Sequence, residues 1–449
     1  MKEPEASREL FGHPRGLTYL FTTEMWERFS YYGMRALLVL YMVKYLFDPA
    51  RVQQVIGFAT VKGALEWLFG PLEVQPLSSL IYGSYTGFVY IAPLAGGYLA
   101  DRVLGQRRMV LIGASLMAVG HFLMAFEPLF LFALLFLILG NGAFKPNIST
   151  QVGALYAPGD PRRDHAFSIF YVGINIGAFL APLICGTLGE RVGWHYGFAA
   201  AGIGMTIGLC TYLFATRHLP PDPRSVVLAR GEVKPFGRDE WRAIVSLVVL
   251  ALPVTLFWAT YDQQGNTLVL WAEDYTDRNV GSLFVIPTTW FQAVNPFMIF
   301  AFTPLVLAFW RRQAARGKEP STLLKMAYGC FGNAAANLVM AAAALSLDGG
   351  KASWLWLMAY FIVITVAELY LSPISLSLVT KIAPARALSM MMGAWMLTYT
   401  GGFLGGYLGS LWSGMAKGPF FLMIAAIAAL AGLFILAFVR PLKGALGEK

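Results

Sequence analysis

Charged residues are scarce in this sequence. Only 13% of its 449 residues are Asp, Glu, Lys or Arg, about half the share that is usual in soluble globular domains. Hydrophobic residues make up 57% of the chain and the mean hydropathy is +0.59. Many apolar segments are at least as long as the roughly 20 residues that a membrane-spanning helix needs. These features exclude an ordinary soluble domain and predict an all-α protein that crosses a membrane many times.

Cysteine and histidine are also rare. The three cysteines, Cys185, Cys210 and Cys330, lie in apolar segments at unrelated spacings, which argues against a disulfide framework or a metal site. Among the five histidines, only His121 lies well inside a predicted span, where a packed residue is the simpler interpretation. The chain also lacks the His-Glu-x-x-His, Gly-x-Ser-x-Gly and P-loop patterns. An enzyme is therefore disfavoured.

The apolar segments predict twelve spans. They lie at 17–45, 77–101, 107–126, 129–154, 165–190, 194–216, 241–272, 284–311, 321–346, 353–382, 386–414 and 418–439. Outside them, Lys and Arg concentrate in the N-terminus, the even-numbered loops and the C-terminus, which places both termini in the cytoplasm. This topology accounts for the net charge of +9 without a nucleic-acid partner. The first apolar stretch is too long for a cleavable signal peptide, so we expect an integral plasma-membrane protein surrounded by lipid.

The longest charged, proline-containing stretch between spans lies at 218–240. It divides the chain into an N-terminal bundle of six spans (1–217) and a C-terminal bundle of six spans (241–449), with 218–240 as a cytoplasmic linker. Two six-helix bundles are typical of the major facilitator superfamily, in which the substrate site lies near the bilayer midplane between the bundles.

The loop after the second span contains Asp101 and Arg102 within the sequence Gly-Tyr-Leu-Ala-Asp-Arg-Val-Leu-Gly-Gln-Arg-Arg at 97–108. It resembles the facilitator signature, in which acidic and basic residues latch helix ends together on the cytoplasmic side. A plain positive-inside loop is the alternative.

Residues 53–70 alternate apolar and polar side chains but are too short and too polar to span a membrane. We predict a periplasmic amphipathic helix that lies at the membrane interface. An irregular loop is the alternative.

The first span carries charges at its centre: Glu24, Glu27, Arg28 and Arg35. Each charge at the centre of a membrane helix costs about 2.5–3.5 kcal/mol on insertion scales, so such residues usually face a bundle interior or a water-filled path. At 100° per residue these four residues and Tyr31 share one stripe of the helix. The stripe predicts a polar pathway through the membrane.

The residues from Glu24 to Tyr32 read Glu-Met-Trp-Glu-Arg-Phe-Ser-Tyr-Tyr. This segment resembles the hallmark Glu-x-x-Glu-Arg-Phe-x-Tyr-Tyr of the proton-dependent oligopeptide transporter family. Residues 142–149 and 170–177 agree with that family as well, and the resemblance covers essentially the whole chain. It implies a bacterial twelve-span symporter in the inner membrane that imports di- and tripeptides together with protons by alternating access.

The resemblance also implies how a peptide zwitterion would be bound. Arg35 and Lys145 would face its carboxylate, and Glu368 on the tenth span would face its amine. Asn175 and Asn295 match the family's amine-side and backbone-binding asparagines. The remaining residues expected at the site are Tyr31, Tyr32, Tyr90, Trp258 and Ser372, with Trp395 as a further candidate. For each aromatic residue, plain helix packing is the alternative.

Proton coupling is expected to involve carboxylates whose partners change with conformation. We predict a switched pair of Glu27 and Lys145 that is tuned by Glu24 and Arg28; a permanent ion network is the alternative. The resemblance adds Asp262, an acidic residue that helps to close an outer gate.

Two departures from the family limit these expectations. The 24 residues from Arg217 to Glu240 cannot hold the two extra helices of many bacterial members. Gly83 occupies the position of a histidine that animal members use in protonation, so carboxylates should handle the proton.

We expect no cofactor or metal besides the coupling proton, and a monomer. Plant relatives with a similar motif carry nitrate, which is the main rival substrate, although a monovalent anion needs no amine-binding carboxylate. Peptide-like drugs are further possible substrates.

Overall fold

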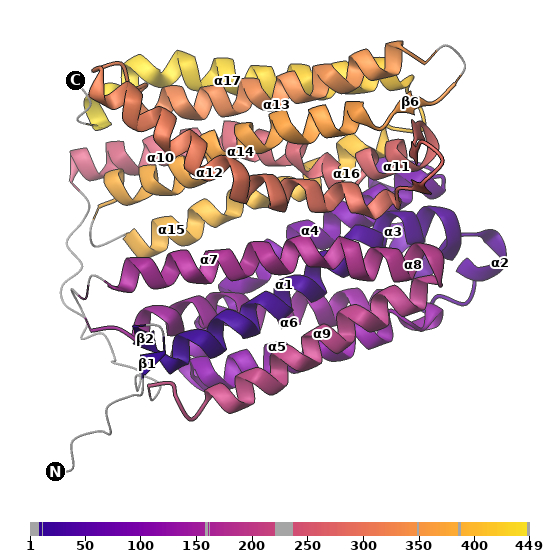
Figure 1. Cartoon of the computed structure of the whole chain (residues 1–449), viewed down its shortest axis with the longest axis horizontal. Coiled ribbons are helices and arrows are strands. Elements are labelled where there is room, and N and C mark those ends of the chain that lie inside the picture. Colours follow the sequence, from indigo (N-terminus) through magenta and orange to yellow (C-terminus); the bar gives the residue numbers. More distant parts are fainter. Residues whose placement is uncertain are drawn as a thin grey trace. The chain divides into compact units, whose positions relative to one another are not determined.

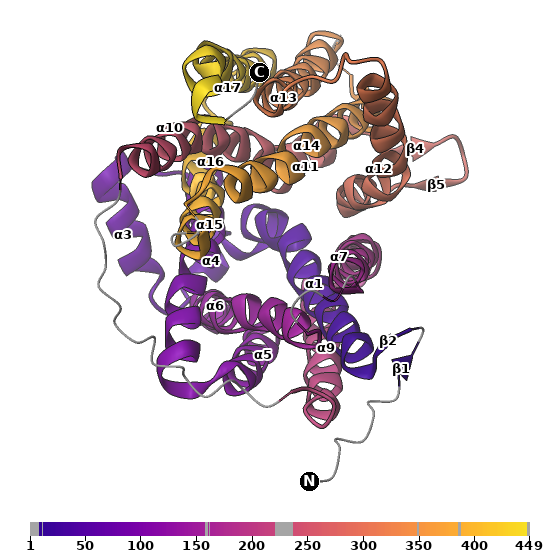
Figure 2. The ribbon, with the colours of Figure 1, turned by 90° about the vertical axis from the view of Figure 1, so that its left-hand side faces the viewer.

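The structure is a computed structural model that describes residues 9–10, 12–157, 160, 162–220, 237–347, 350–384 and 388–446. The described chain is almost entirely helical and forms two compact units. Unit 1 comprises Met1–Trp67 and Phe88–Ala229, and unit 2 comprises Leu68–Gly87 and Arg230–Lys449. Within each unit the long helices run side by side (Figure 1 and Figure 2).

Unit 1 is built around α1, which packs against α7 and α9, while α5 packs against α6 and α9. Several of its helices continue as short π-helical or 3-10 turns. Its elements are β1 (Glu9–Leu10), β2 (His13–Pro14), α1 (Arg15–Tyr41) with η1 (Met42–Leu46), α2 (Pro49–Val52), most of α3 (Phe58–Phe69), the second half of α4 (Val74–Leu99) with η2 (Ala100–Leu104), α5 (Gln106–Leu123), η3 (Glu127–Leu129) with α6 (Phe130–Ala154), α7 (Arg162–Ala181) with η4 (Pro182–Gly186) and α8 (Thr187–Arg191), and α9 (Trp194–Ala215). Strands β1 and β2 form an antiparallel pair.

Unit 2 packs α13 against α14 and α17, and α10 against α16 and α17. Its elements are the first half of α4, α10 (Arg238–Tyr261) with η5 (Asp262–Gly265) and α11 (Thr267–Asp274), β3 (Thr276–Asp277), β4 (Asn279–Val280), β5 (Phe284–Val285), η6 (Thr288–Trp290) with α12 (Phe291–Ala315), α13 (Thr322–Leu345), β6 (Ala352–Ser353), α14 (Leu355–Ile382), α15 (Leu388–Met396) with η8 (Leu397–Thr400) and α16 (Gly401–Ser410), and α17 (Lys417–Leu446). The strands form a parallel β3–β6 pair and an antiparallel β4–β5 pair.

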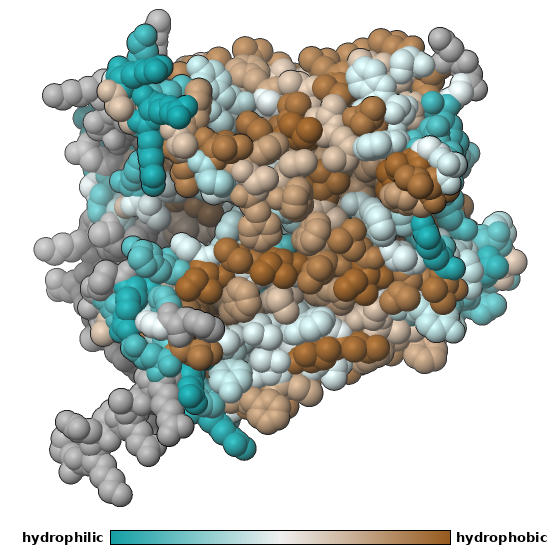
Figure 3. Space-filling view, in the orientation of Figure 1, coloured by the Kyte–Doolittle hydropathy of each residue, from teal (hydrophilic) through white to brown (hydrophobic). Residues whose placement is uncertain are grey.

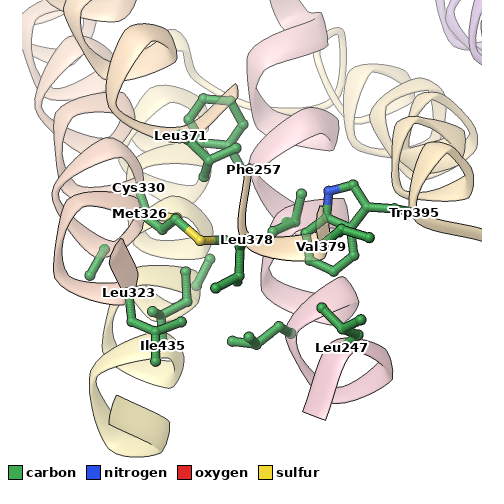
Figure 4. Packing of buried hydrophobic residues seen from close by; sticks show 14 of the residues in the cluster. Leu247, Phe257, Leu323, Met326, Cys330, Leu371, Leu378, Val379, Trp395 and Ile435 are labelled. Atoms are coloured by element: carbon green, nitrogen blue, oxygen red, sulfur yellow. The ribbon is translucent and has the colours of Figure 1, made fainter. Parts of the chain in front are cut away.

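A large apolar core holds unit 2 together. Side chains from α10, α13, α14 and α17 interlock in it, with Phe257, Met326 and Leu371 among the fully buried ones (Figure 4). Trp395 from α15 also joins this core.

The first half of α4 packs against α16 at glycine positions. A Cβ atom added at Gly83 would collide with the backbone of Gly406, and one added at Gly402 would collide with the Thr86 side chain. Small residues allow helix backbones to approach closely in membrane proteins. This close contact explains why residues 68–87 belong to unit 2 although the rest of α4 belongs to unit 1.

The helices agree with an integral membrane protein. Within the described part of the chain, eight helices are long and apolar enough to span a membrane, and each of them overlaps one of the predicted spans. The other four predicted spans coincide with α1, α4, α5 and the α15–α16 segment. Figure 3 shows apolar side chains along the middle of the helices and hydrophilic ones toward their ends, on the face that is drawn.

Two predicted segments outside the spans have different outcomes. The predicted helix at 53–70 is present as α3, at 58–69; none of its residues is buried and Trp67 is 84% exposed. Its position at a membrane interface stays a prediction. Within the predicted linker at 218–240, residues 221–236 lie outside the described part of the chain.

Candidate functional site

Three charged side chains of α1 are buried together in unit 1. Glu24, Glu27 and Arg28 are exposed by only 3%, 0% and 5%. The Nε atom of Arg28 lies 3.0 Å from Oε1 of Glu24 and also pairs with Oε2 of Glu27. The Arg28 guanidinium lies 5.5 Å from the ring centroid of Tyr31. Two carboxylates therefore share one guanidinium on the stripe that the sequence predicts.

Helix α6 completes this cluster. The Nδ2 atom of Asn141 donates a hydrogen bond to Oε1 of Glu27 at 3.3 Å. One turn later, Nζ of Lys145 lies 4.3 Å from the ring centroid of Tyr90, within electrostatic reach of Glu24 and Glu27. No ion pair joins Lys145 to Glu27 in the described structure. The cluster thus holds two acidic and two basic side chains, with Lys145 resting on an aromatic face.

Some polar atoms of this cluster have unused hydrogen-bonding capacity. Oε2 of Glu24 and Nη2 of Arg28 are buried and have no hydrogen-bond partner among the described residues. A buried polar atom without a partner costs about 1–3 kcal/mol, and such atoms in native structures need a reason, such as a functional role or an ion or water molecule that is bound there. The cluster can therefore accept a further proton or polar group.

Glu368 on α14 is the acidic centre of unit 2. Its Oε2 atom accepts a hydrogen bond from the Tyr261 hydroxyl at 2.7 Å and another from Nδ2 of Asn295 at 2.9 Å. Nδ2 of Asn295 also donates to Oγ1 of Thr365 at 3.0 Å. Within the described residues no cationic side chain pairs with Glu368. Only neutral groups donate hydrogen bonds to its carboxylate among the described residues. Its negative charge is therefore available to pair with a cationic group of a ligand.

Aromatic residues pack next to Tyr261, which is one of the two donors to Glu368. The Trp258 ring lies 4.3 Å from that of Tyr399 and contacts Tyr261 edge-on at 5.2 Å. Trp395 is 3% exposed, belongs to the apolar core and donates to Oγ of Ser375 at 3.4 Å. Trp258 is thus beside Glu368's partners, whereas Trp395 is a core residue.

Asp262 begins η5 and faces the first half of α4. Its two carboxylate oxygens lie 3.5 Å from the Tyr82 hydroxyl and 3.4 Å from Oγ1 of Thr86. One turn further along, Asn266 accepts a hydrogen bond from Ser79 at 2.7 Å. Asp262 therefore belongs to a polar seam that joins α4 to the α10–α11 segment within unit 2.

The remaining predicted residues lie on α1, α7 and α14. The Asn175 side chain is buried and donates to the backbone oxygen of Tyr171 at 3.0 Å. Tyr31 and Tyr32 contact each other edge-on at 5.2 Å, and half-buried Arg35 follows one turn later. Ser372 lies one turn after Glu368 on α14, and its backbone oxygen accepts from Ser375.

The signature loop contains a contact that the sequence did not reveal. Asp101 and Arg102 are exposed in η2, and the latch predicted for them stays a prediction. Arg107, at the start of α5, instead donates to the backbone oxygens of Leu219 and Pro220. It thereby fixes the chain where it leaves α9.

Sequence comparisons identify relatives along most of the chain. The family model described as the POT family matches residues 107–230 and 226–422. The "Peptide transporter YePEPT" of Yersinia enterocolitica is 34% identical, covering 92% of this chain and 89% of that protein. The "Di-/tripeptide transporter" of Lactococcus lactis subsp. cremoris is 32% identical, covering 99% of each chain.

Solved structures agree with these matches. A crystal structure of a peptide transporter POT in complex with sulfate superposes with a TM-score of 0.84 at 29% identity, covering 98% of this chain and 97% of that one. A POT family transporter in complex with 5-aminolevulinic acid gives a TM-score of 0.81 at 27% identity, covering 97% and 98%. These matches confirm the predicted major facilitator fold. The chain therefore belongs to the proton-dependent oligopeptide transporter (POT) family, whose members move solutes across membranes and are not enzymes.

Proposed function

We propose that this protein is a proton-coupled symporter that imports di- and tripeptides by alternating access across a bacterial inner membrane. The relatives named as peptide and di-/tripeptide transporters support this proposal. Structures of POT transporters in complex with alafosfalin and with a thioalcohol-conjugated peptide extend the substrate class to peptide-like compounds. The observation that carries the proposal is that, among the described residues, Glu368 of one unit has only neutral hydrogen-bond donors and Lys145 of the other rests on the Tyr90 ring without a direct ion pair.

A short peptide offers the charges that these two residues need. Its terminal ammonium can pair with Glu368, which has only neutral hydrogen-bond donors in the described structure. Its terminal carboxylate can pair with Lys145 and with the forked guanidinium of Arg35. Both termini occur in every unmodified peptide, so recognition through them tolerates different side chains. Nitrate has no cation to satisfy Glu368, and the site therefore favours a zwitterion.

The α1 cluster provides the proton site in this proposal. Glu24 and Glu27 repel each other and share Arg28, so a proton on either carboxylate relieves that repulsion. In the present arrangement Glu27 is paired with Arg28 and Asn141, and Lys145 rests on Tyr90. We propose that this arrangement is one state of the switch and that Glu27 pairs with Lys145 in another. The seam around Asp262 would act as the outer gate.

The test is uptake of a radiolabelled dipeptide by purified protein in liposomes, with and without an inward proton gradient. Accumulation above equilibrium that an uncoupler abolishes is the expected result. Glu27→Gln and Lys145→Ala should lose accumulation, because each removes one partner of the switch. The control is Lys351→Ala, which removes an exposed lysine outside the spans and should transport like wild type.

Two results would contradict the proposal. Folded wild-type protein that takes up no di- or tripeptide would argue against peptide transport and favour a small anion such as nitrate. Peptide uptake that is indifferent to the gradient would retain the substrate and reject proton coupling.

A further inference from the structure

We infer that Tyr261 is a positioning residue that orients Glu368 so that one defined carboxylate oxygen faces the terminal amine of the substrate. The inference rests on the proposed peptide transport and deepens it. Tyr261 is not among the residues that the sequence or the family resemblance marked as part of the site.

The two hydrogen bonds to Glu368 meet at one atom. The Tyr261 hydroxyl and Nδ2 of Asn295 both donate to Oε2, at 2.7 and 2.9 Å, and Oε1 receives no hydrogen bond within the described residues. An ionised carboxylate has about four lone-pair sites, two on each oxygen. The protein therefore occupies Oε2 and leaves the lone pairs of Oε1 for another donor.

Both donors are themselves held in place. The Tyr261 ring stacks on Phe257 at 5.7 Å and meets Trp258 edge-on at 5.2 Å, and Phe257 is fully buried in the apolar core. A tyrosine has few rotatable bonds, so a packed ring fixes its hydroxyl. The hydroxyl thus points at Glu368 from a rigid base.

Asn295 is held in place by a hydrogen bond to Thr365. Its amide also donates to Oγ1 of Thr365 at 3.0 Å, and that hydroxyl donates to the backbone oxygen of Phe361 at 2.6 Å. The Asn295 amide group has two hydrogens, which can serve Thr365 and Glu368 together. The Asn295 contact therefore has a defined direction as well.

Two donors on one oxygen fix the plane of the carboxylate, because a partial rotation of the group would move that oxygen away from both donors. A ligand ammonium that meets an already oriented acceptor orders fewer groups when it binds. A supporting residue of this kind improves a site by holding the contacting group in its productive geometry. Loss of the Tyr261 hydroxyl should therefore weaken binding of a free amine specifically.

The test variant is Tyr261→Phe, which keeps the ring and its packing and removes only the hydroxyl. We expect the KM for a free-amine dipeptide to rise about tenfold, the size expected for one hydrogen bond to a charged group, while the maximal rate stays within about twofold. An N-acetylated dipeptide lacks the ammonium, so its inhibition constant should change less than about twofold. The matched control is Tyr360→Phe on α14, because the buried Tyr360 hydroxyl has no partner among the described residues.

Other outcomes decide against the inference. An unchanged KM, or an equal weakening of the free and the acetylated peptide, would show that Tyr261 has only a packing role. If Tyr261→Phe does not fold, Thr365→Val loosens Asn295 instead and should give the same amine-selective increase in KM. If wild-type protein transports no peptide, the proposed function fails separately. Thermal stabilisation by the free and the acetylated dipeptide would then still show whether Tyr261 contributes to amine binding.

Discussion

At the scale of single residues, the α1 cluster shows how charges are accommodated within a spanning helix. Arg28 pairs with Glu24 and Glu27, so one of these two negative charges is offset within the helix itself. Asn141 of α6 then supplies a neutral donor to Glu27. Removing one member of a buried ion pair is expected to cost more than removing the whole group, because it leaves an uncompensated charge.

This asymmetry gives a prediction for Arg28. Arg28→Met should destabilise the protein by about 3–5 kcal/mol, because two buried carboxylates then lose the cation that is paired with them. The triple variant Glu24→Gln, Glu27→Gln, Arg28→Met should recover part of that loss, since the two carboxylates that lost their cation are then neutral and only Lys145 keeps its charge. Thermal unfolding in detergent measures both variants. Equal destabilisation of the two would show that Arg28 contributes through its packing and not through its charge.

The sequence predicted part of the site at this scale. Glu24, Glu27, Arg28 and Lys145 do come together in the structure, but their roles stay predictions. Asn141 could have been found, because it lies one turn before Lys145 on the same face of α6. Tyr261 could not, since its hydroxyl reaches Glu368 across 107 residues and an aromatic residue beside Trp258 is typical of packing alone.

At the scale of elements, hydropathy predicted the helices because crossing a bilayer requires long apolar segments. Their interruptions were not predicted. The 3-10 turn η5 divides α10 from α11, and the π-helical turns η1, η2 and η4 end or interrupt other helices. Hydropathy also gave no sign that α4 changes partners between Gly87 and Phe88, because both halves of that helix are apolar. Such features depend on contacts distant in sequence.

The close contact of α4 with α16 gives a prediction for one glycine. Gly83→Ala should destabilise the protein by about 1–3 kcal/mol, because the new methyl group would meet the Gly406 backbone and force the helices apart. Gly97→Ala on the same helix is the control: its Cβ would meet Pro146 at an ordinary 3.9 Å, and alanine favours helix over glycine. Thermal unfolding compares the two, and equal stabilities would contradict a tight contact at Gly83.

At the scale of the whole molecule, the predicted family and fold are confirmed by the family model and by the solved relatives. The count of twelve spans is consistent with the structure, whose described residues include eight helices that are each long and apolar enough to span a membrane. The orientation in the membrane rests on the distribution of Lys and Arg and remains a prediction.

Cysteine labelling tests that orientation. Gly63 on α3 faces open space, so Gly63→Cys should react in intact cells with a membrane-impermeant maleimide added outside. Exposed Lys318, which follows α12, lies on the predicted cytoplasmic side, and Lys318→Cys should react only after the membrane is opened. Both are made in a Cys210→Ala background, because Cys210 is exposed. The reverse pattern would invert the predicted topology.

The charged cluster of α1 has a consequence for how the protein is synthesised. Helix α1 is not among the eight described helices that are long and apolar enough to span a membrane. Asn141, which donates a hydrogen bond to Glu27, follows 114 residues later in the chain. At about 5–20 residues per second, the ribosome needs on the order of ten seconds to make that stretch. During this interval the nascent first helix carries Glu24 and Glu27 together with Arg28, but the hydrogen bond from Asn141 cannot yet form. Helix α1 should therefore become stably integrated into the bilayer only after α6 has been made. The first helices of unit 1 should then insert together and not one by one.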